Sequence, residues 1–233
     1  KNILREENKY GGSEKNGGQK ARVEYVSANP TGPLHIGNAR GGPLGESISR
    51  VLEKTGYKVL REYYHNDVGT QVEKMGDTLM YWYQKLLGTE TEFPEGGYLG
   101  EYLREVAETA LSQLGKDLKK EDLGRLTRFG LEQIFKENSD TINRLRIKFD
   151  SVVKESELLS SEKTSKVVED LRKKGVAKEK EGAVWFSPKT GFLDEDHESV
   201  LIRSTGQPTY FASDAAYHKE KFSSGYDLVV DIL

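Results

Sequence analysis

Hydrophobic positions along the chain follow two spacings, and the first of them marks strands on either side of a helix. Residues 23–26 and 57–64 are short runs of β-branched and aromatic side chains, which predict two strands. A helix is expected at residues 39–55, with apolar side chains at helical spacing: Leu44, Ile48, Val51 and Leu52. A strand, a helix and a strand within about forty residues form a βαβ unit, so the sequence predicts a parallel sheet with a right-handed crossover.

Beyond residue 69 the helical spacing dominates. Residues 70–87 place a row of apolar side chains on one face of a helix: Val72, Met75, Leu79, Trp82 and Leu86. The same spacing predicts further helices at residues 98–114, 123–149 and 158–174. This middle part of the chain is therefore expected to be mainly helical.

Short apolar segments return toward the C-terminus. Residues 184–186 and 191–193 lie around turn-forming residues and predict a small hairpin. Residues 200–203 and 210–211 bracket another turn, a helix is expected at 211–222, and residues 228–233 read as a closing strand. The sequence thus returns from a helical region to an α/β region.

Both ends of the chain predict a longer protein. Residues 1–20 are polar and contain two Gly-Gly pairs, so we expect a linker from a preceding domain. The strand at 228–233 is the last element, although doubly wound sheets place functional loops after the carboxyl ends of their strands. We therefore expect the chain to be truncated at both ends.

Composition narrows the function classes. The 233 residues carry a formal net charge of −3, so no broad basic field indicates strong nonspecific binding to nucleic acid. The absence of cysteine excludes disulfides and thiolate metal sites and fits a reducing compartment. No apolar run approaches the roughly 20 residues needed to span a bilayer, and no signal-peptide core is present. We expect a soluble, cytoplasmic protein without membrane contact.

The turn between the first strand and the first helix carries the most informative residues. It contains Asn29, Gly32 and Pro33 and leads into His35-Ile-Gly-Asn38. A strand, a Gly-rich turn and a helix start can present backbone N–H groups to a phosphate, and imidazole and amide side chains add further donors. The alternative is structural, with a turn histidine and Asn38 capping the helix. That capping role is expected of Asn38 in either case.

The sequence of this turn resembles a known family. His35-Ile-Gly-Asn38 is similar to the His-x-Gly-His signature of class I aminoacyl-tRNA synthetases, with asparagine in place of the second histidine. The longer string Ser-Ala-Asn-Pro-Thr-Gly-Pro-Leu-His-Ile-Gly-Asn-Ala-Arg at 27–40 resembles arginyl-tRNA synthetases in particular. The resemblance implies a Rossmann-like class I catalytic domain with a parallel sheet, interrupted by a mainly helical insertion that carries a small β-hairpin.

That resemblance also implies how the chain is divided. Residues 1–20 would be the linker from a missing N-terminal domain, and residues 21–87 the first half of the catalytic domain. Residues 88–198 would be an insertion similar to a connective peptide, and residues 199–233 the start of the second half.

The implied activity is arginine–tRNA ligase. L-arginine and ATP with Mg²⁺ would give arginyl-adenylate and pyrophosphate, and the arginyl group would then pass to tRNA(Arg). His35 and Asn38 would be catalytic, and Pro33, His35, Gly37 and Asn38 would bind ATP. The family characteristically needs bound tRNA before it activates arginine. We expect a monomer with no protein-bound metal, and little or no tRNA charging from these residues alone.

A second group of residues resembles the family's arginine pocket. Tyr210 and Asp214 are spaced i and i+4, so on a helix they share one face and could meet a planar guanidinium. The resemblance adds further arginine-binding residues: Glu24, Ser27, Asn29 and Asn38. The structural alternative is a core tyrosine and an aspartate that complements the dipole in the first helical turn.

Three other motifs receive structural interpretations. His-Asn-Asp-Val-Gly-Thr-Gln at 65–71 resembles the same family, but we assign it no chemistry and expect Asp67 to cap a helix. Lys-Thr-Ser-Lys at 163–166 is similar to the Lys-Met-Ser-Lys loop of class I synthetases, yet its place inside the insertion favours a solvated helix start. Asp-Glu-Asp-His at 194–197 has metal-ligand residue types, but adjacent ligands point in different directions, so we expect a solvated turn.

Two other functions stay open on the sequence. A different class I synthetase would share the His35 turn but should lack the Tyr210 and Asp214 pair. A noncatalytic module that binds arginine or tRNA would retain the same residues without the chemistry.

Overall fold

The computed structural model describes residues 2–160, 162–188 and 198–232. The chain forms two compact units. The helical unit comprises residues 23–51, 60–153 and 231–233. The hairpin unit comprises residues 1–22, 52–59 and 154–230.

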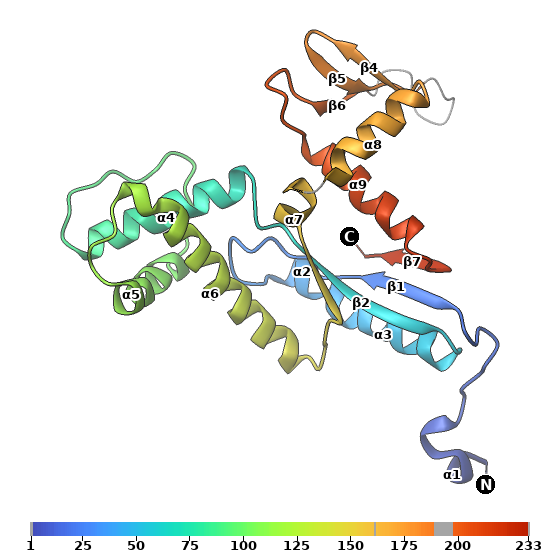
Figure 1. Ribbon diagram of the computed structural model, residues 1–233. Coiled ribbons are helices and arrows are strands. Elements are labelled where there is room, and N and C mark those ends of the chain that lie inside the picture. The colour runs from blue at the N-terminus through green and yellow to red at the C-terminus, as the bar shows by residue number, and fades with distance from the viewer. Residues whose placement is uncertain (1, 161, 189–197, 233) are drawn as a thin grey trace. The chain divides into compact units, whose positions relative to one another are not determined.

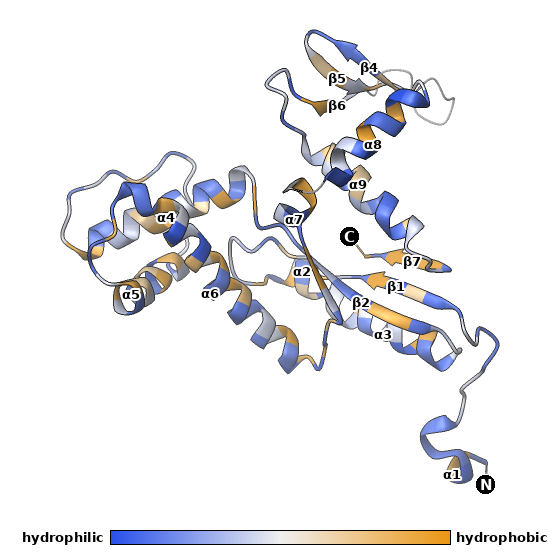
Figure 2. Cartoon of the chain, viewed as in Figure 1, coloured by the Kyte–Doolittle hydropathy of each residue, from blue (hydrophilic) through white to orange (hydrophobic). Residues whose placement is uncertain are grey.

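Four strands form one sheet in the order β3-β2-β1-β7 (Figure 1). Their bounds are β1 Lys20–Glu24, β2 Lys58–His65, β3 Ser151–Lys154 and β7 Leu228–Asp231. The helix α3, Gly41–Lys54, connects β1 to β2, which confirms the predicted βαβ unit and the α/β fold class. Figure 2 shows hydrophobic residues along β1, β2 and β7. The strand β3 was not expected from the sequence.

The strand β1 ends at Glu24, two residues before the predicted end. Val26 and Ser27 have φ angles of +69° and +37°, a region that non-glycine residues rarely adopt and that cannot continue a strand. Pairing nevertheless persists beyond Glu24, since the Tyr25 amide donates to the Glu62 carbonyl and the Ile232 amide donates to the Glu24 carbonyl. The backbone therefore changes direction sharply at residues 26–27, where the segment that leads to His35 begins.

The helix α3 packs through small residues rather than through its predicted apolar stripe. Its buried residues are Gly42, Gly45 and Ser49. A Cβ on Gly45 would lie 2.2 Å from Cγ of Tyr25, so the helix approaches this residue, which follows β1, too closely for a side chain. Leu44 is 53% exposed and Val51 is 61% exposed, so the apolar stripe seen in the sequence is not the face that this helix buries. Close backbone approach at the glycines determines which face of this helix is buried.

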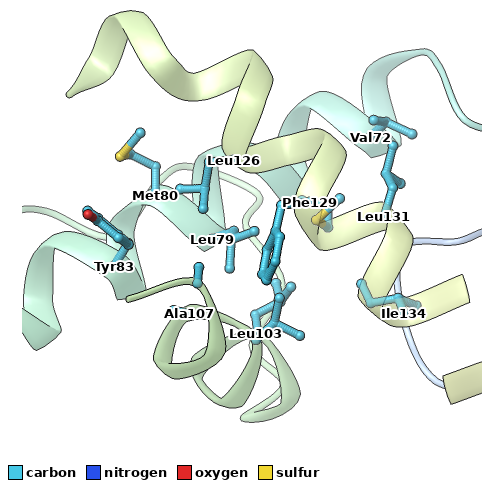
Figure 3. Close-up of a cluster of buried hydrophobic side chains, with 13 residues drawn as sticks. Val72, Leu79, Met80, Tyr83, Leu103, Ala107, Leu126, Phe129, Leu131 and Ile134 are labelled. Carbon is cyan, nitrogen blue, oxygen red and sulfur yellow. The ribbon is translucent and has the colours of Figure 1, made fainter. Parts of the chain in front are cut away.

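Three helices form the main core of the helical unit, and the sequence predicted all three. They are α4 Thr70–Leu86, α5 Tyr102–Leu114 and α6 Leu123–Arg144. Figure 3 shows Leu79, Leu103, Leu126 and Phe129 directed into the space between them. Leu79 and Leu126 are fully buried, as interlocking side chains of a dense core should be.

The ends of these helices differ from the predicted bounds. The helix α5 begins four residues later than expected, after a loop that contains Tyr98. The helix α6 ends at Arg144, because Arg146 has a φ of +59° and turns the chain toward β3. A 3₁₀ turn, η2 Lys120–Asp122, precedes α6.

The hairpin unit contains a second sheet, antiparallel and ordered β4-β5-β6. Its strands are β4 Ala177–Lys180, β5 Ala183–Phe186 and β6 Ser199–Ile202. The two-residue turn between β4 and β5 has positive φ at both positions, Glu181 (+55°) and Gly182 (+73°), as a type I′ hairpin turn requires. The expected strand at 184–186 is present as β5, and it forms a hairpin with β4. Residues 191–193 lie outside the described part of the chain.

Helices cover this second sheet and complete the hairpin unit. The helices α7 Glu155–Ser160 and α8 Glu162–Lys173 replace the single helix predicted at 158–174, and α9 Tyr210–Ser223 matches its prediction closely. A small core joins α8, the three strands and α9: Val168, Ala177, Val184, Leu201 and Ala212. The first residues of the chain form a short helix, α1 Asn2–Glu6, and a 3₁₀ turn, η1 Glu7–Lys9.

Candidate functional site

His35 determines the geometry of the turn that the sequence singled out. It is the N-cap of a short helix, α2 Ile36–Ala39, and its Nδ1 accepts a hydrogen bond of 3.1 Å from the Gly37 amide. The His35 carbonyl accepts from the amides of Asn38 (3.1 Å) and Ala39 (2.9 Å). His35 therefore caps this helix, and the expectation that Asn38 caps it was wrong. The backbone donors of residues 37–39 are used within the turn rather than offered to a ligand.

This cap leaves one donor on the imidazole ring. Because Nδ1 accepts from Gly37, a neutral ring must carry its proton on Nε2. The His35 side chain is exposed, so Nε2–H can donate to an oxygen of a bound molecule. A Cβ on Gly37 would lie 2.9 Å from the His35 ring, which explains why glycine occupies this position.

A cavity of about 270 Å³ lies beside this turn in the helical unit. It is lined by Val26, Gly37, Asn38, Arg40, Gly41, Leu44 and Ile232. The wall combines apolar side chains and two glycines with the amide of Asn38 and the guanidinium of Arg40, so it could take a flat ring together with anionic groups. Sequence reasoning assigned no role to Arg40, although it is the last residue of the family string at 27–40. The predicted ATP residue Pro33 is exposed in the turn before His35.

The segment before this turn is fixed by a separate set of contacts. The Ser27 hydroxyl donates to a carboxylate oxygen of Glu24 at 2.8 Å and accepts from the Tyr64 amide at 3.0 Å. The Tyr63 hydroxyl donates to the Ala28 carbonyl at 2.9 Å. Glu24 is only 8% exposed. Two of the predicted arginine-binding residues, Glu24 and Ser27, therefore interact directly.

The start of α4 positions the third of these residues. The Asn29 side-chain amide donates to Oε1 of Gln71 at 2.8 Å. Gln71 ends the 65–71 motif, to which the sequence assigned no chemistry, and its contact with Asn29 could not be read from spacing. The N-cap of α4 is Gly69, with a φ of +97°, so the expected cap by Asp67 was wrong.

Tyr210 and Asp214 lie on α9 in the hairpin unit. Tyr210 is the first residue of the helix and Asp214 follows one turn later, and both side chains are exposed. The first turn of α9 contains no acidic residue, so the structural interpretation of Asp214 as a first-turn dipole partner was wrong. Their association with Glu24, Ser27, Asn29 and His35 stays a prediction.

The motifs at 163–166 and 194–197 were both interpreted from the sequence as solvated segments without a functional role. Lys163 and Lys166 lie in the exposed first turns of α8 and pair with Glu220 and Glu162, which confirms a solvated helix start. Residues 194–197 lie outside the described ranges. Within residues 2–160, 162–188 and 198–232, no group of three or more His, Cys, Asp or Glu is placed to bind a metal ion. No helix in these same ranges has the length and apolar character to cross a membrane.

Comparison with known proteins gives a consistent family. Residues 1–231 match the family model for class I tRNA synthetases (R), catalytic domain. An arginine–tRNA ligase of Desulfotalea psychrophila is 43% identical over 224 residues, which cover 96% of this chain and 40% of that protein. A ligase of the same name from Caldanaerobacter subterraneus is 43% identical over 220 residues, covering 92% and 39%. The chain thus spans about two fifths of the length of these curated relatives.

Comparison with solved structures also finds arginyl-tRNA synthetases. A Campylobacter jejuni protein described as an arginyl-tRNA synthetase matches with a TM-score of 0.90 and 33% identity, covering 100% of this chain and 51% of that one. The arginyl-tRNA synthetase of Thermus thermophilus matches with a TM-score of 0.61 and 25% identity, covering 88% and 36%.

Proposed function

The chain belongs to the family of class I tRNA synthetase (R) catalytic domains, and from this premise we propose that it supplies the ATP- and arginine-binding part of an arginine–tRNA ligase. The observation that carries the proposal is the cap formed by His35. It fixes the ring so that Nε2–H is the exposed donor, beside a cavity lined by Gly37 and Asn38.

The reaction needs positioning more than a protein nucleophile. A carboxylate oxygen of arginine attacks the α-phosphorus of MgATP, the bond from that phosphorus to the oxygen bridging it to the β-phosphorus breaks, and pyrophosphate leaves. Negative charge grows on the phosphate oxygens in the transition state, where fixed donors are most effective. We assign that role to Nε2–H of His35 and the side-chain amide of Asn38. Pro33 and Gly37 shape the surface on which ATP lies.

Arginine specificity requires a carboxylate for the guanidinium. Asp214 supplies a negative charge and Tyr210 a hydroxyl acceptor one helical turn away. A fork of N–H donors fits such a pair better than an ammonium does. We assign the opposite end of the substrate to Glu24, Ser27, Asn29 and Asn38, three of which are fixed by hydrogen bonds at the end of β1.

The remaining assignments follow from the same proposal. Residues 1–20 act as a linker, residues 21–87 and 199–233 belong to the catalytic domain, and residues 88–198 form the insertion. The activated arginyl group passes to the 3′ end of tRNA(Arg). The lack of cysteine fits a cytoplasmic location, and the lack of a broad basic field fits tRNA binding through local contacts. We assign the protein as a monomer.

Binding of a nonhydrolysable arginyl-adenylate analogue tests the proposal directly. We expect the full-length gene product to bind the arginyl analogue at least about 100-fold more tightly than the lysyl analogue in isothermal titration calorimetry, a difference of about 2.7 kcal/mol. Equal affinity for the two analogues would contradict the assignment to arginine. Absence of binding to either analogue would contradict an adenylate site in this chain.

A further inference from the structure

One buried asparagine interrupts an otherwise apolar helix face in the helical unit. The inward residues of α6 are hydrophobic or glycine except for Asn138. Asparagine is a poor residue for a helix interior, and a buried amide is costly unless its hydrogen bonds are satisfied. Asn138 is 3% exposed, so its presence needs a partner.

Its partners are two backbone groups of the turn that precedes His35. The Asn138 side-chain amide donates to the Gly32 carbonyl at 3.1 Å, and its Oδ1 accepts from the Leu34 amide at 3.1 Å. The Asn138 side chain thus satisfies the carbonyl of the residue before Pro33 and the amide of the residue after it. Because both bonds go to the main chain, they fix the path of the backbone rather than one rotamer.

Two tyrosines fix the residue before this bridge. The Tyr102 hydroxyl donates to the Thr31 carbonyl at 2.5 Å, and the Tyr98 hydroxyl donates to Oγ1 of Thr31 at 3.2 Å. Thr31 is buried, and burial raises the pKa of Tyr102 to about 12, with a further contribution from Tyr98. The Tyr102 hydroxyl therefore stays a donor throughout the neutral range.

These contacts form a clamp that is separate from the one on the preceding segment. Ser27, Ala28 and Asn29 are fixed by β2 and the start of α4. Residues 31–34 are fixed by Tyr98, Tyr102 and Asn138, which lie in the segment proposed as the insertion. The arginine-binding and ATP-binding parts of one turn therefore have independent supports.

We propose that Asn138 and Tyr102 are positioning residues for adenylate formation, which act by setting the backbone of residues 31–34 and hence the place of His35. This inference rests on the proposed function. Without the clamp we expect the cap formed by His35 to remain, but the turn to shift relative to the rest of the cavity wall, Val26, Leu44 and Ile232. Misplacement by about 1 Å can cost on the order of 100-fold in rate.

The test compares substitutions of Asn138 in the full-length gene product, using arginine-dependent ATP–pyrophosphate exchange with tRNA present. Asn138→Leu has a similar size and removes both hydrogen bonds. We expect its kcat to fall by at least about tenfold, with KM for arginine within about twofold of the unsubstituted value. Asn143→Leu is the matched control, since Asn143 is an exposed residue of the same helix. We expect it to retain normal kinetics.

Two milder substitutions distinguish loss of the clamp from a general folding defect. Tyr102→Phe removes one hydroxyl from the clamp, whereas Tyr83→Phe removes a hydroxyl of the helical core that donates to the Gly115 carbonyl and accepts from the Leu118 amide. We expect Tyr102→Phe alone to lower kcat. Amide hydrogen exchange should rise in a peptide spanning 31–41 for Asn138→Leu and Tyr102→Phe, and stay unchanged there for both controls.

Two outcomes separate failure of this inference from failure of the proposed function. Normal kcat and normal amide exchange in both clamp variants, with an active parent protein, would overturn the inference alone. Equal loss of kcat in Tyr102→Phe and Tyr83→Phe would also overturn it, because general destabilisation would then suffice. A parent protein without arginine-dependent exchange would contradict the proposed function itself.

Discussion

The two ring nitrogens of His35 have different roles, and this separates its structural contribution from its proposed catalytic one. Nδ1 accepts from the Gly37 amide, which leaves Nε2–H for a phosphate oxygen. His35→Ala removes both roles, and we expect kcat for adenylate formation to fall by about 100- to 1000-fold, as for other transition-state donors. KM for arginine should change little. Steady-state exchange kinetics with arginine and ATP varied separately measure both quantities.

His35→Asn provides the control for this change. Asparagine is a good N-cap, so it can accept from the Gly37 amide while its shorter side chain fails to reach the position of Nε2. We expect its unfolding free energy to stay close to that of the parent and its kcat to remain low. Full recovery of kcat in His35→Asn would show that the cap is the only role of His35.

Asp214 is the residue that should select arginine. Loss of its charge leaves a desolvated guanidinium without a partner, which costs roughly 3–5 kcal/mol. We expect Asp214→Asn to raise KM for arginine by about two orders of magnitude or more, with KM for ATP nearly unchanged. Citrulline, which has the same shape without the charge, should lose its disadvantage relative to arginine in this variant.

A second aspartate supplies the comparison for that experiment. Asp140 is an exposed residue of α6, so Asp140→Asn removes the same charge elsewhere on the surface. We expect normal KM values from it. An Asp214→Asn protein that is less stable but binds arginine normally would instead identify Asp214 as a purely structural residue.

At the scale of single residues, the sequence identifies the residues of the turn at 29–38 but not the side chains that fix its position. His35, Gly37 and Asn38 are adjacent, so a short motif suffices to select them. Gln71 lies 42 positions from Asn29, and Asn138 lies 104 positions from Leu34. Hydrogen bonds between such distant residues depend on tertiary packing, and a single polar residue in an apolar helix face is the only signal that could have suggested Asn138.

At the scale of elements, the close contact of α3 with β1 makes a specific demand on Gly45. A methyl group there would collide with the base of the Tyr25 ring. We expect Gly45→Ala to lower the free energy of unfolding by roughly 1–3 kcal/mol, as overpacking of a tight interface does. Urea denaturation followed by circular dichroism measures this change.

Gly124 in α6 is the matched control, since a Cβ there meets no atom within 4 Å. Gly124→Ala should be neutral or stabilising by up to about 1 kcal/mol, because alanine favours the helix. If Gly45→Ala were equally well tolerated, α3 would not lie against Tyr25 as described.

Glu46 links the same helix to the sheet and should make stability depend on pH. Burial alone would raise its pKa, but hydrogen bonds from Arg50, Tyr25 and Arg61 outweigh burial and lower it below its ordinary value of 4.5. A lowered folded-state pKa gives stability that is present above 4.5 and lost as the pH falls through the folded value. We expect Glu46→Gln to reduce stability at pH 7 and to flatten its decline below pH 4.5.

Glu162→Gln provides the comparison for this pH dependence. The pKa of Glu162 is also lowered, first by its hydrogen bond to Lys166, but this pair is fully exposed and solvent screens it. We expect denaturation curves of Glu162→Gln to follow the parent at each pH. A Glu46→Gln protein that matches the parent between pH 3 and 7 would contradict a stabilising role for Glu46.

Long elements were predictable from periodicity, whereas short ones depended on their neighbours. The helices α4 and α9 fall within one or two residues of their predicted bounds, because an apolar stripe recurs over several turns. The strand β4 is Ala-Lys-Glu-Lys, which has no strand pattern, and pairing with β5 alone makes it a strand. The strand β3 was missed because four residues are too few to show alternation.

At the scale of the whole molecule, family membership and fold rest on nearly the full chain. The family model covers residues 1–231, and the sheet order with its connecting helix agrees with the class predicted from the first strand, helix and strand. Since the chain spans about two fifths of the length of its curated relatives, the complete ligase reaction stays a proposal.

Arginine-dependent ATP–pyrophosphate exchange, measured on the full-length gene product, tests the proposed arginine–tRNA ligase function most directly. The assay compares arginine with each of the other common amino acids, with and without tRNA, so it distinguishes a ligase from a noncatalytic relative that only binds arginine. We expect arginine to be the only amino acid that supports exchange, and we expect this exchange only when tRNA is present. Exchange that prefers another amino acid, or no exchange with arginine and tRNA together, would contradict the assignment.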